Sequence, residues 1–193
     1  MTNWEAKYQA GETPWDKGAP SPGLIDYLNG EPVRGRVLVP GCGFGHDVRA
    51  LAATADEVVG IDVAPSAILA ARSFPPVRGE HYEHANLFDL PPEMRGSFEW
   101  VWEHTCFCAI DPAMRPAYVE AVAGALKPGG KLLAVFYLDP GNDSPDEGPP
   151  FEVPIPELDR LFLGRFELVR EWMPSNAYTG REGREWMRIL RLR

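Results

Sequence analysis

Three glycines, Gly41, Gly43 and Gly45, alternate with other residues directly after the apolar run at residues 36–40 and before a predicted helix. Glycine permits a tight turn with positive φ and lets a ligand approach the bare backbone, and the N-terminus of the next helix offers unpaired N–H groups. Asp62 ends the following apolar run, roughly 20 residues further on, where an acidic side chain can accept hydrogen bonds from both hydroxyls of a ribose. This combination predicts a site for a cofactor that contains a nucleoside.

The spacing of the glycines separates this loop from dinucleotide-binding loops. Those loops read Gly-x-Gly-x-x-Gly, and their third glycine would fall at His46 of this sequence. The observed Gly-x-Gly-x-Gly spacing therefore disfavours a nicotinamide oxidoreductase, which stays an alternative that nucleotide titration would test.

The cysteines and the paired histidines give no sign of a metal site or of a disulfide framework. Cys42, Cys106 and Cys108 cannot all pair within one chain, and we expect them to be small buried side chains rather than nucleophiles. His81 and His84 lie three positions apart in a segment that alternates like a strand, so they would point to opposite faces. No metal is therefore predicted.

Five segments of the chain resemble the thiopurine and halide/thiol methyltransferases, a family that uses S-adenosyl-L-methionine. These segments are W-x3-Y-x2-G-x-TPWD-x-G at the N-terminus, VPGCG, LFDLP, CFCAIDP-x2-R and GPPFEVP. The resemblance covers nearly the whole chain, and EHTCFCAI at residues 103–110 looks closer to the halide/thiol branch than to the thiopurine branch. It implies a methyltransferase that acts on a small soft nucleophile, such as a thiol, hydrosulfide, thiocyanate, halide or related chalcogen species.

The resemblance also implies which residues hold the cofactor. Two positions depart from the family pattern: Tyr8 stands where a further tryptophan is common, and Glu103-His104 replaces an Asp-Tyr or Asp-Arg pair. The positions that match cofactor-binding positions of the family are Trp4, Tyr8, Trp15, Gly41, Gly43, Gly45, Asp62, Asn86, Leu87, Glu103 and His104.

The N-terminal aromatic residues suit a sulfonium cofactor, because a cation above an aromatic ring is stabilised by about 0.5–2 kcal/mol. Trp4 and Tyr8, four positions apart, would share one face of a short helix, and ordinary packing explains them equally well. Trp15 lies in a segment rich in proline and glycine, where packing is a weaker explanation. Residues 1–30 are therefore predicted to form a lid segment and a helix.

His104 is the candidate catalytic residue on the acceptor side. The ordinary pKa of histidine, about 6.5, lets both protonation states exist near neutral pH, so this side chain could deprotonate a thiol or attract an anion. A purely structural role at the end of a strand is the alternative. The Asn/Asp-Pro-Pro-aromatic motif that holds amino groups is missing at residues 103–106, which disfavours nitrogen acceptors.

A loop and a group of arginines are two further candidates for parts of the site. The loop at residues 139–150 is expected either to rim the substrate or to be a solvated acidic loop. The arginines at positions 181, 184, 188, 191 and 193 are expected to form a solvated face.

Apolar runs alternate with helical stretches from residue 36 onward, which is typical of strand–helix–strand units. The sequence predicts an α/β fold: a doubly wound, Rossmann-like, mainly parallel sheet of seven strands with helices on both faces, ending in an antiparallel hairpin. The predicted strands cover residues 36–40, 57–63, 81–86, 98–104, 131–138, 166–172 and 185–192. Two predicted helices cover residues 46–54 and 113–126, and two more begin at Pro65 and Pro156.

Composition limits the possible partners. Lys and Arg number 19 against 28 Asp and Glu, and the net charge of −9 argues against a face that binds nucleic acid phosphates. The longest apolar run, at residues 132–138, is far shorter than the roughly 20 residues of a membrane span, and the N-terminus lacks the apolar stretch of a signal peptide. The expectation is a single domain over residues 1–193, cytoplasmic and monomeric, with a small-molecule substrate.

Two further functions stay open. One is methylation of oxygen in a small molecule, and the other is S-adenosyl-L-methionine binding without catalysis.

Overall fold

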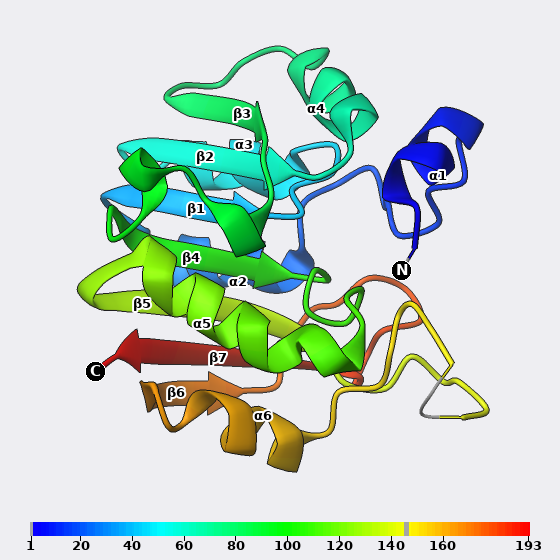
Figure 1. The fold of residues 1–193 in the computed structure, drawn as a ribbon, viewed down its shortest axis with the longest axis vertical. Coiled ribbons are helices and arrows are strands. Elements are labelled where there is room, and N and C mark those ends of the chain that lie inside the picture. Colours follow the sequence, from blue (N-terminus) through cyan, green and yellow to red (C-terminus); the bar gives the residue numbers. More distant parts are fainter. Residues whose placement is uncertain (1, 145–146) are drawn as a thin grey trace.

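A computed structural model describes residues 2–144 and 147–193 of the chain. A seven-stranded sheet in the order β3-β2-β1-β4-β5-β7-β6 forms its centre (Figure 1). The strands are β1 (Arg36–Pro40), β2 (Glu57–Asp62), β3 (Glu80–His84), β4 (Phe98–His104), β5 (Leu126–Tyr137), β6 (Phe166–Trp172) and β7 (Glu185–Leu192). The predicted α/β fold class and the strand count are confirmed.

Strand β7 is the one that runs against its neighbours in this sheet. It pairs antiparallel with both β5 and β6, whereas β1 to β5 pair in parallel. The predicted C-terminal hairpin is therefore confirmed, with β6 as the edge strand. Because β6 ends and β7 begins at the same edge of the sheet, the connection at residues 173–184 lies at the carboxyl ends of the parallel strands.

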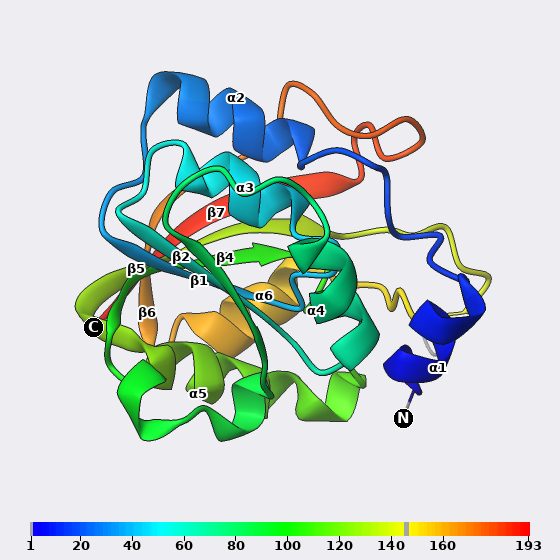
Figure 2. The ribbon, with the colours of Figure 1, turned by 90° about the horizontal axis from the view of Figure 1, so that it is seen from above.

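Helices cover both faces of the sheet and build two hydrophobic cores (Figure 2). Side chains of α2, α3 and α4 fill one core, and side chains of α5 and α6 fill the other. The helices are α2 (Pro22–Gly30), α3 (His46–Ala52), α4 (Pro65–Arg72), α5 (Arg115–Ala125) and α6 (Ile155–Phe162), with 3₁₀ turns at Leu87–Asp89, Pro92–Met94 and Pro112–Met114.

Helix α1 (Trp4–Ala10) belongs to neither layer. It lies beyond the carboxyl ends of the parallel strands, next to α4 (Figures 1 and 2). None of its residues is fully buried. This position places the N-terminal segment where ligands bind in open α/β sheets.

The ends of the helices follow local sequence signals. Proline stands in the first turn of α2, α4, α5 and α6, where its missing N–H costs nothing. The predicted helix at 113–126 is shorter at both ends, because Pro112–Met114 form a 3₁₀ turn and Leu126 already pairs with Phe98 in the sheet. Among the described residues, no helix has the length and apolar character needed to cross a membrane.

Candidate active site

A cavity of about 940 Å³ opens at the carboxyl ends of the parallel strands. Its wall combines the N-terminal segment, the loop between β1 and α3, the ends of β2 and β4, and parts of the loops before α6 and β7. Residues that contribute to the wall include Trp4, Tyr8, Trp15, Gly41, Gly43, Asp62, Asn86, Leu87, His104, Cys106, Phe151, Tyr178 and Arg181. Most of the predicted site residues therefore meet in one place.

The glycine loop needs its glycines for two different reasons. Gly41, Gly43 and Gly45 all have positive φ, at 61°, 53° and 72°. Gly43 lies on the cavity wall, and a Cβ there would come within 3.0 Å of the Tyr8 hydroxyl. Gly45 is not on the wall: a Cβ there would lie 2.5 Å from the Tyr82 ring, so this glycine serves the packing of α3 against β3 rather than ligand contact.

Asp62 joins the end of β2 to the glycine loop. Its Oδ2 accepts a hydrogen bond from the Gly43 N–H at 3.0 Å, and its Oδ1 accepts one from the Ala64 N–H at 2.9 Å. Burial raises the pKa of this carboxyl, although the backbone donors oppose the shift. Each carboxylate oxygen can accept more than one hydrogen bond, so the group can also receive ribose hydroxyls.

Asn86 and Leu87 follow β3 and form the neighbouring part of the wall. The Asn86 side chain accepts a hydrogen bond from the Phe88 N–H at 3.0 Å and caps the 3₁₀ turn that starts at Leu87. Both residues line the same cavity as Gly41, Gly43 and Asp62.

The three predicted aromatic residues of the N-terminal segment touch one another. The Trp15 ring centroid lies 5.3 Å from that of Trp4 and 5.6 Å from that of Tyr8, and the Trp15 indole N–H donates to the Tyr8 hydroxyl at 3.3 Å. Tyr8 also lies 5.6 Å from Phe44 of the glycine loop. The rings therefore pack together and also line the cavity.

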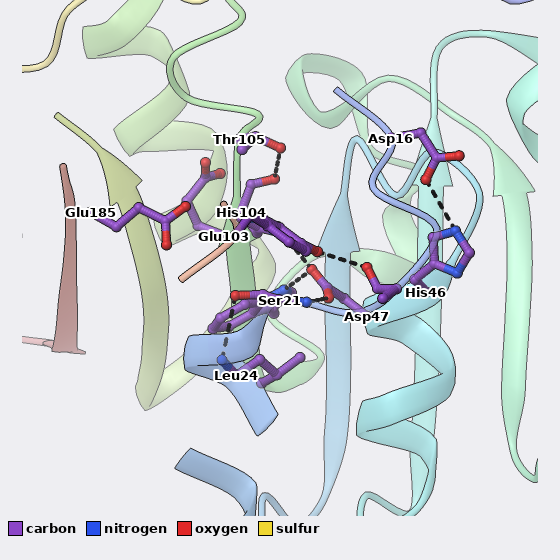
Figure 3. Close-up of polar contacts among 12 residues, drawn as sticks. Asp16, Ser21, Leu24, His46, Asp47, Glu103, His104, Thr105 and Glu185 are labelled. Carbon is purple, nitrogen blue, oxygen red and sulfur yellow. Dashed lines mark hydrogen bonds and ion pairs between the residues drawn. The ribbon is translucent and has the colours of Figure 1, made fainter. Parts of the chain in front are cut away.

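Two polar contacts hold this segment over the cavity. Glu5 accepts hydrogen bonds from the Ser66 hydroxyl at 2.7 Å and from the Ser66 N–H at 3.0 Å, at the start of α4. Asp16 lies 3.1 Å from Nε2 of His46 at the start of α3 (Figure 3). We define residues 2–20 as the N-terminal strap.

His104 is paired with a carboxylate that the sequence analysis did not select. Its Nδ1 lies 2.7 Å from Oδ2 of Asp47, in the first turn of α3 (Figure 3). Asp47 also accepts hydrogen bonds from the Trp102 indole at 2.8 Å and from the Ser21 N–H at 2.7 Å. Burial alone would raise the pKa of Asp47, but His104 beside it and the hydrogen bonds from His104, Trp102 and Ser21 hold it below the ordinary value.

The connection between β6 and β7 covers the other side of His104. The Tyr178 ring stacks on the imidazole with centroids 5.9 Å apart, and its hydroxyl donates to the Ala19 carbonyl of the strap at 2.7 Å. Arg181 lies on the cavity wall, with its guanidinium 4.5 Å from the centre of the Tyr137 ring. Glu185 at the start of β7 lies 3.4 Å from Arg181, and its pKa is raised by burial.

The expectation that the C-terminal arginines form a solvated face is wrong for two of them. Arg181 is 8% exposed and Arg188 only 1%. Arg188 pairs with Asp159 and Glu171, which ties β7 to α6 and β6. Arg181 lies in the connection before β7 and pairs with Glu185, whereas Arg188 lies within β7 and has partners that are distant in sequence.

The family model described as Thiopurine S-methyltransferase matches residues 1–179 of the chain. The chain belongs to this family. Its relatives include probable thiol methyltransferase 2 of Arabidopsis thaliana, which is 33% identical over 165 residues, or 83% of this chain and 71% of the relative. Thiocyanate methyltransferase 1 of Brassica oleracea is 36% identical with the same coverage, and the Vibrio campbellii thiopurine S-methyltransferase is 32% identical over 66% of this chain and 64% of its own.

Solved structures share the fold at low sequence identity. A protein from work on the conversion of a disulfide bond into a thioacetal group in echinomycin biosynthesis superposes with a TM-score of 0.80, at 22% identity, over 98% of this chain and 90% of its own. The Burkholderia thailandensis 1,6-didemethyltoxoflavin-N1-methyltransferase, solved with S-adenosylhomocysteine, gives 0.72 at 18% identity over 97% and 84%. This member of the thiopurine S-methyltransferase family is therefore an S-adenosyl-L-methionine-dependent methyltransferase.

The residues present in the cavity of this methyltransferase fit that cofactor. Gly41 and Gly43 leave the backbone bare beside the wall, where a Cβ on Gly41 would approach Cys106 Sγ to 3.1 Å. Asp62 offers a carboxylate, and Trp4, Tyr8 and Trp15 offer ring surface for a sulfonium.

Glu103, like Gly45, is a predicted cofactor contact that does not line the cavity. Its carboxyl is 1% exposed, accepts a hydrogen bond from the Phe107 N–H at 2.8 Å and another from the Tyr118 hydroxyl. Burial raises its pKa to about 7. Neighbouring residues of a strand point to opposite faces, so Glu103 and His104 cannot both face the cofactor.

The turn that Glu103 supports carries a strained residue. Thr105 has a φ of 63°, the positive value of a non-glycine residue, and it lies on the cavity wall. A β-branched residue rarely adopts this conformation, and such strain concentrates at functional sites. The buried carboxyl of Glu103 therefore fixes the turn that follows His104.

The remaining sequence candidates have minor places in the site. Cys42, Cys106 and Cys108 are free thiols on the wall, and burial raises the pKa of each, as expected for unreactive side chains. Within residues 2–144 and 147–193, no group of three or more His, Cys, Asp or Glu side chains could hold a metal ion. Part of the loop at 139–150 does rim the cavity, through residues 148–150, while Pro145 and Asp146 lie outside the described residues.

Proposed function

We propose that this methyltransferase transfers a methyl group to a small soft nucleophile: a thiol, hydrosulfide, thiocyanate, halide or related chalcogen species. The observation that carries the proposal is the Asp47–His104 pair on the wall of a cavity that aromatic residues cover. The names of the thiol and thiocyanate methyltransferases that the chain resembles support the same acceptor class.

The cofactor side of the cavity is formed by Trp4, Tyr8, Trp15, Gly41, Gly43, Asp62, Asn86 and Leu87. When bound, S-adenosyl-L-methionine supplies an electrophilic methyl group on a sulfonium cation. Asp62 would hold the ribose hydroxyls, and the backbone of Gly41 and Gly43 would lie against the ligand. The strap aromatics would exclude water from the reacting charges.

The acceptor side is formed by His104, Tyr178 and Arg181. Methyl transfer is an in-line displacement, so the acceptor must be held about 3 Å from the methyl group with the correct orientation. Soft nucleophiles need little activation, and a single histidine is sufficient base for a thiol that ionises near pH 8.5.

The first experiment incubates the purified protein with methyl-labelled S-adenosyl-L-methionine and a panel of acceptors. The panel contains iodide, thiocyanate, hydrosulfide, an aromatic thiol, a thiopurine, a phenol and an amine. We expect labelled product with sulfur or halide acceptors. Turnover of the phenol or the amine alone would refute the proposal.

Methylation of an oxygen acceptor is the second candidate function. A relative from Mycobacteroides abscessus, 27% identical over 90% of this chain, is named 2-heptyl-1-hydroxyquinolin-4(1H)-one methyltransferase, and that compound carries a hydroxyl group. The same histidine could take a proton from a hydroxyl. Activity on hydroxylated ring compounds without activity on thiols would favour this function.

We also propose that the protein works as a cytoplasmic monomer in which residues 1–193 form one domain, residues 1–30 being its lid segment and helix. The net charge of −9 supports a small-molecule substrate rather than nucleic acid or a membrane surface. Light scattering coupled to size exclusion would measure the oligomeric state, and a mass of twice 21.4 kDa would contradict the monomer.

A further inference from the structure

The two ring nitrogens of His104 have different surroundings. Nδ1 lies 2.7 Å from Oδ2 of Asp47, whereas Nε2 is buried and has no hydrogen-bond partner among the residues that the structure describes. An ionised carboxylate can only accept, so Nδ1 carries the hydrogen of this contact. A neutral His104 therefore presents the lone pair of Nε2.

Several groups lie around the imidazole of His104, and Nε2 stays without a partner among the described residues. The acidic groups that interact with the ring are Asp47 from α3, Glu103 from β4 and Glu185 from β7, and the Tyr178 ring stacks on it. Asp47 orients the ring and would stabilise the positive charge once a proton arrives.

We propose that Asp47 and His104 form a proton-accepting pair that makes small protic sulfur compounds, hydrogen sulfide and low-molecular-weight thiols, the preferred acceptors over thiocyanate and halide ions. This inference rests on the proposed function and narrows its acceptor class. The Tyr178 ring stacks on His104 with centroids 5.9 Å apart, and Nε2 is buried without a partner among the described residues.

The step balances without any additional reactant. The acceptor S–H gives its proton to Nε2, and its bonding electrons stay on sulfur. That sulfur then forms a bond to the methyl carbon, while the methyl–sulfonium bond breaks and its electron pair remains on the cofactor sulfur, which becomes a neutral thioether. His104 finally releases the proton to solvent.

An anion without a proton gains nothing from this arrangement. The Nε2 lone pair and the carboxylates of Asp47 and Glu185 repel a halide or thiocyanate ion. Lys17 and Arg181 are the lysine and arginine on the described part of the wall, and Arg181 is paired with Glu185. The pair therefore acts on acceptor choice, and its role should be measurable as a difference between protic and aprotic acceptors.

The kinetic test compares wild type with His104→Gln and Asp47→Asn on small thiols of graded acidity, thiocyanate and iodide. For weakly acidic alkyl thiols, we expect His104→Gln to lower kcat/KM by about 10²–10³-fold, and for thiocyanate by less than about threefold. The loss should shrink for thiols whose pKa lies well below the assay pH, because those acceptors arrive ionised. His81→Gln, an exposed histidine on β3, is the matched control and should keep wild-type rates.

A second measurement does not depend on turnover. Long-range ¹H–¹⁵N correlation spectra of the protein without cofactor report which ring nitrogen of His104 carries hydrogen, with His104→Gln providing the assignment. We expect the Nδ1–H form in wild type and a mixture of tautomers in Asp47→Asn. An Nε2–H tautomer or an imidazolium at neutral pH would overturn the inference.

The outcomes separate this inference from the proposed function. Equal losses on thiols and thiocyanate in His104→Gln, or a loss that does not vary with thiol acidity, would overturn the proton-accepting role and leave the soft-nucleophile function standing. A wild-type enzyme that methylates only the phenol or the amine would overturn both. Restored preference for protic acceptors in His104→Gln supplied with free imidazole would support the inference.

Discussion

The buried carboxyl of Glu103 should make the stability of this protein depend on pH in a way that one substitution removes. Burial raises its pKa from 4.5 to about 7 against the opposing hydrogen bonds from Phe107 and Tyr118. Between these two pH values the folded state holds a proton that the unfolded state has lost. Stability therefore falls as the pH rises through this window and stays low above it.

The size of the effect follows from the same shift. Each pKa unit corresponds to about 1.4 kcal/mol, so ionising Glu103 in the folded protein costs about 3 kcal/mol of unfolding free energy at pH 8 relative to pH 4. Glutamine has the same shape, no charge, an oxygen that can accept from the Phe107 N–H and an amide that can donate to the Tyr118 oxygen. The Glu103→Gln variant should lack this component of the pH dependence.

The assay is urea unfolding of both proteins from pH 5 to pH 8. We expect the difference in unfolding free energy to move in favour of Glu103→Gln by about 2–3 kcal/mol across that range. Glu99→Gln is the matched control on the same strand: bonds with Lys127 and Arg36 hold the pKa of Glu99 below its ordinary value despite some burial, so its effect should be constant over these pH values. Parallel pH curves for wild type and Glu103→Gln would refute the reasoning.

Three other changes test the cofactor side of the site and the fold that supports it. Asp62→Ala removes a charged acceptor, so isothermal titration should show S-adenosylhomocysteine binding weakened by about 1–3 kcal/mol, and unchanged affinity would remove Asp62 from the site. Deletion of residues 1–15 removes the aromatic part of the strap and should abolish turnover while circular dichroism still reports a folded sheet; an active truncated enzyme would contradict the role of the strap. Gly45→Ala brings a methyl group to 2.5 Å from the Tyr82 ring at a φ of 72° and should lower stability by about 2 kcal/mol or more in thermal unfolding, whereas a wild-type midpoint would show that the loop can relax.

Most of the fold could be predicted from the sequence because strands and helices leave local patterns. The strand at Phe98–His104 matches its predicted bounds, and the helices that begin near Pro65 and Pro156 follow a local rule for proline. Leu126 is an exception. It pairs with Phe98, which is distant in sequence, and the strand register shifts between Phe98 and Trp100.

The parts of the site that depend on one loop could be predicted from the sequence. The parts that depend on contacts between distant segments could not. The glycines at 41 and 43 and the acid at 62 carry their signal in the local sequence. Asp47 was missed because its partner His104 is 57 positions away, and a lone acid in a first helical turn is common. Glu103 was predicted beside His104 because the two residues were taken as a pair, and the structure places its buried carboxyl off the cavity wall.

The antiparallel direction of β7 places a loop that can vary, residues 173–184, beside the cavity. Because β7 runs antiparallel to β6, the connection at residues 173–184 reaches the cavity as a hairpin loop. The proposed cofactor-binding residues Gly41, Asp62 and Asn86 lie at or just after the ends of β1, β2 and β3, on the other side of the strand order. Loops of this kind accept substitutions and changes in length more readily than the elements they join. Acceptor choice can therefore diverge through this loop, in evolution or by loop exchange in the laboratory, without rebuilding the half of the molecule that binds the methyl donor.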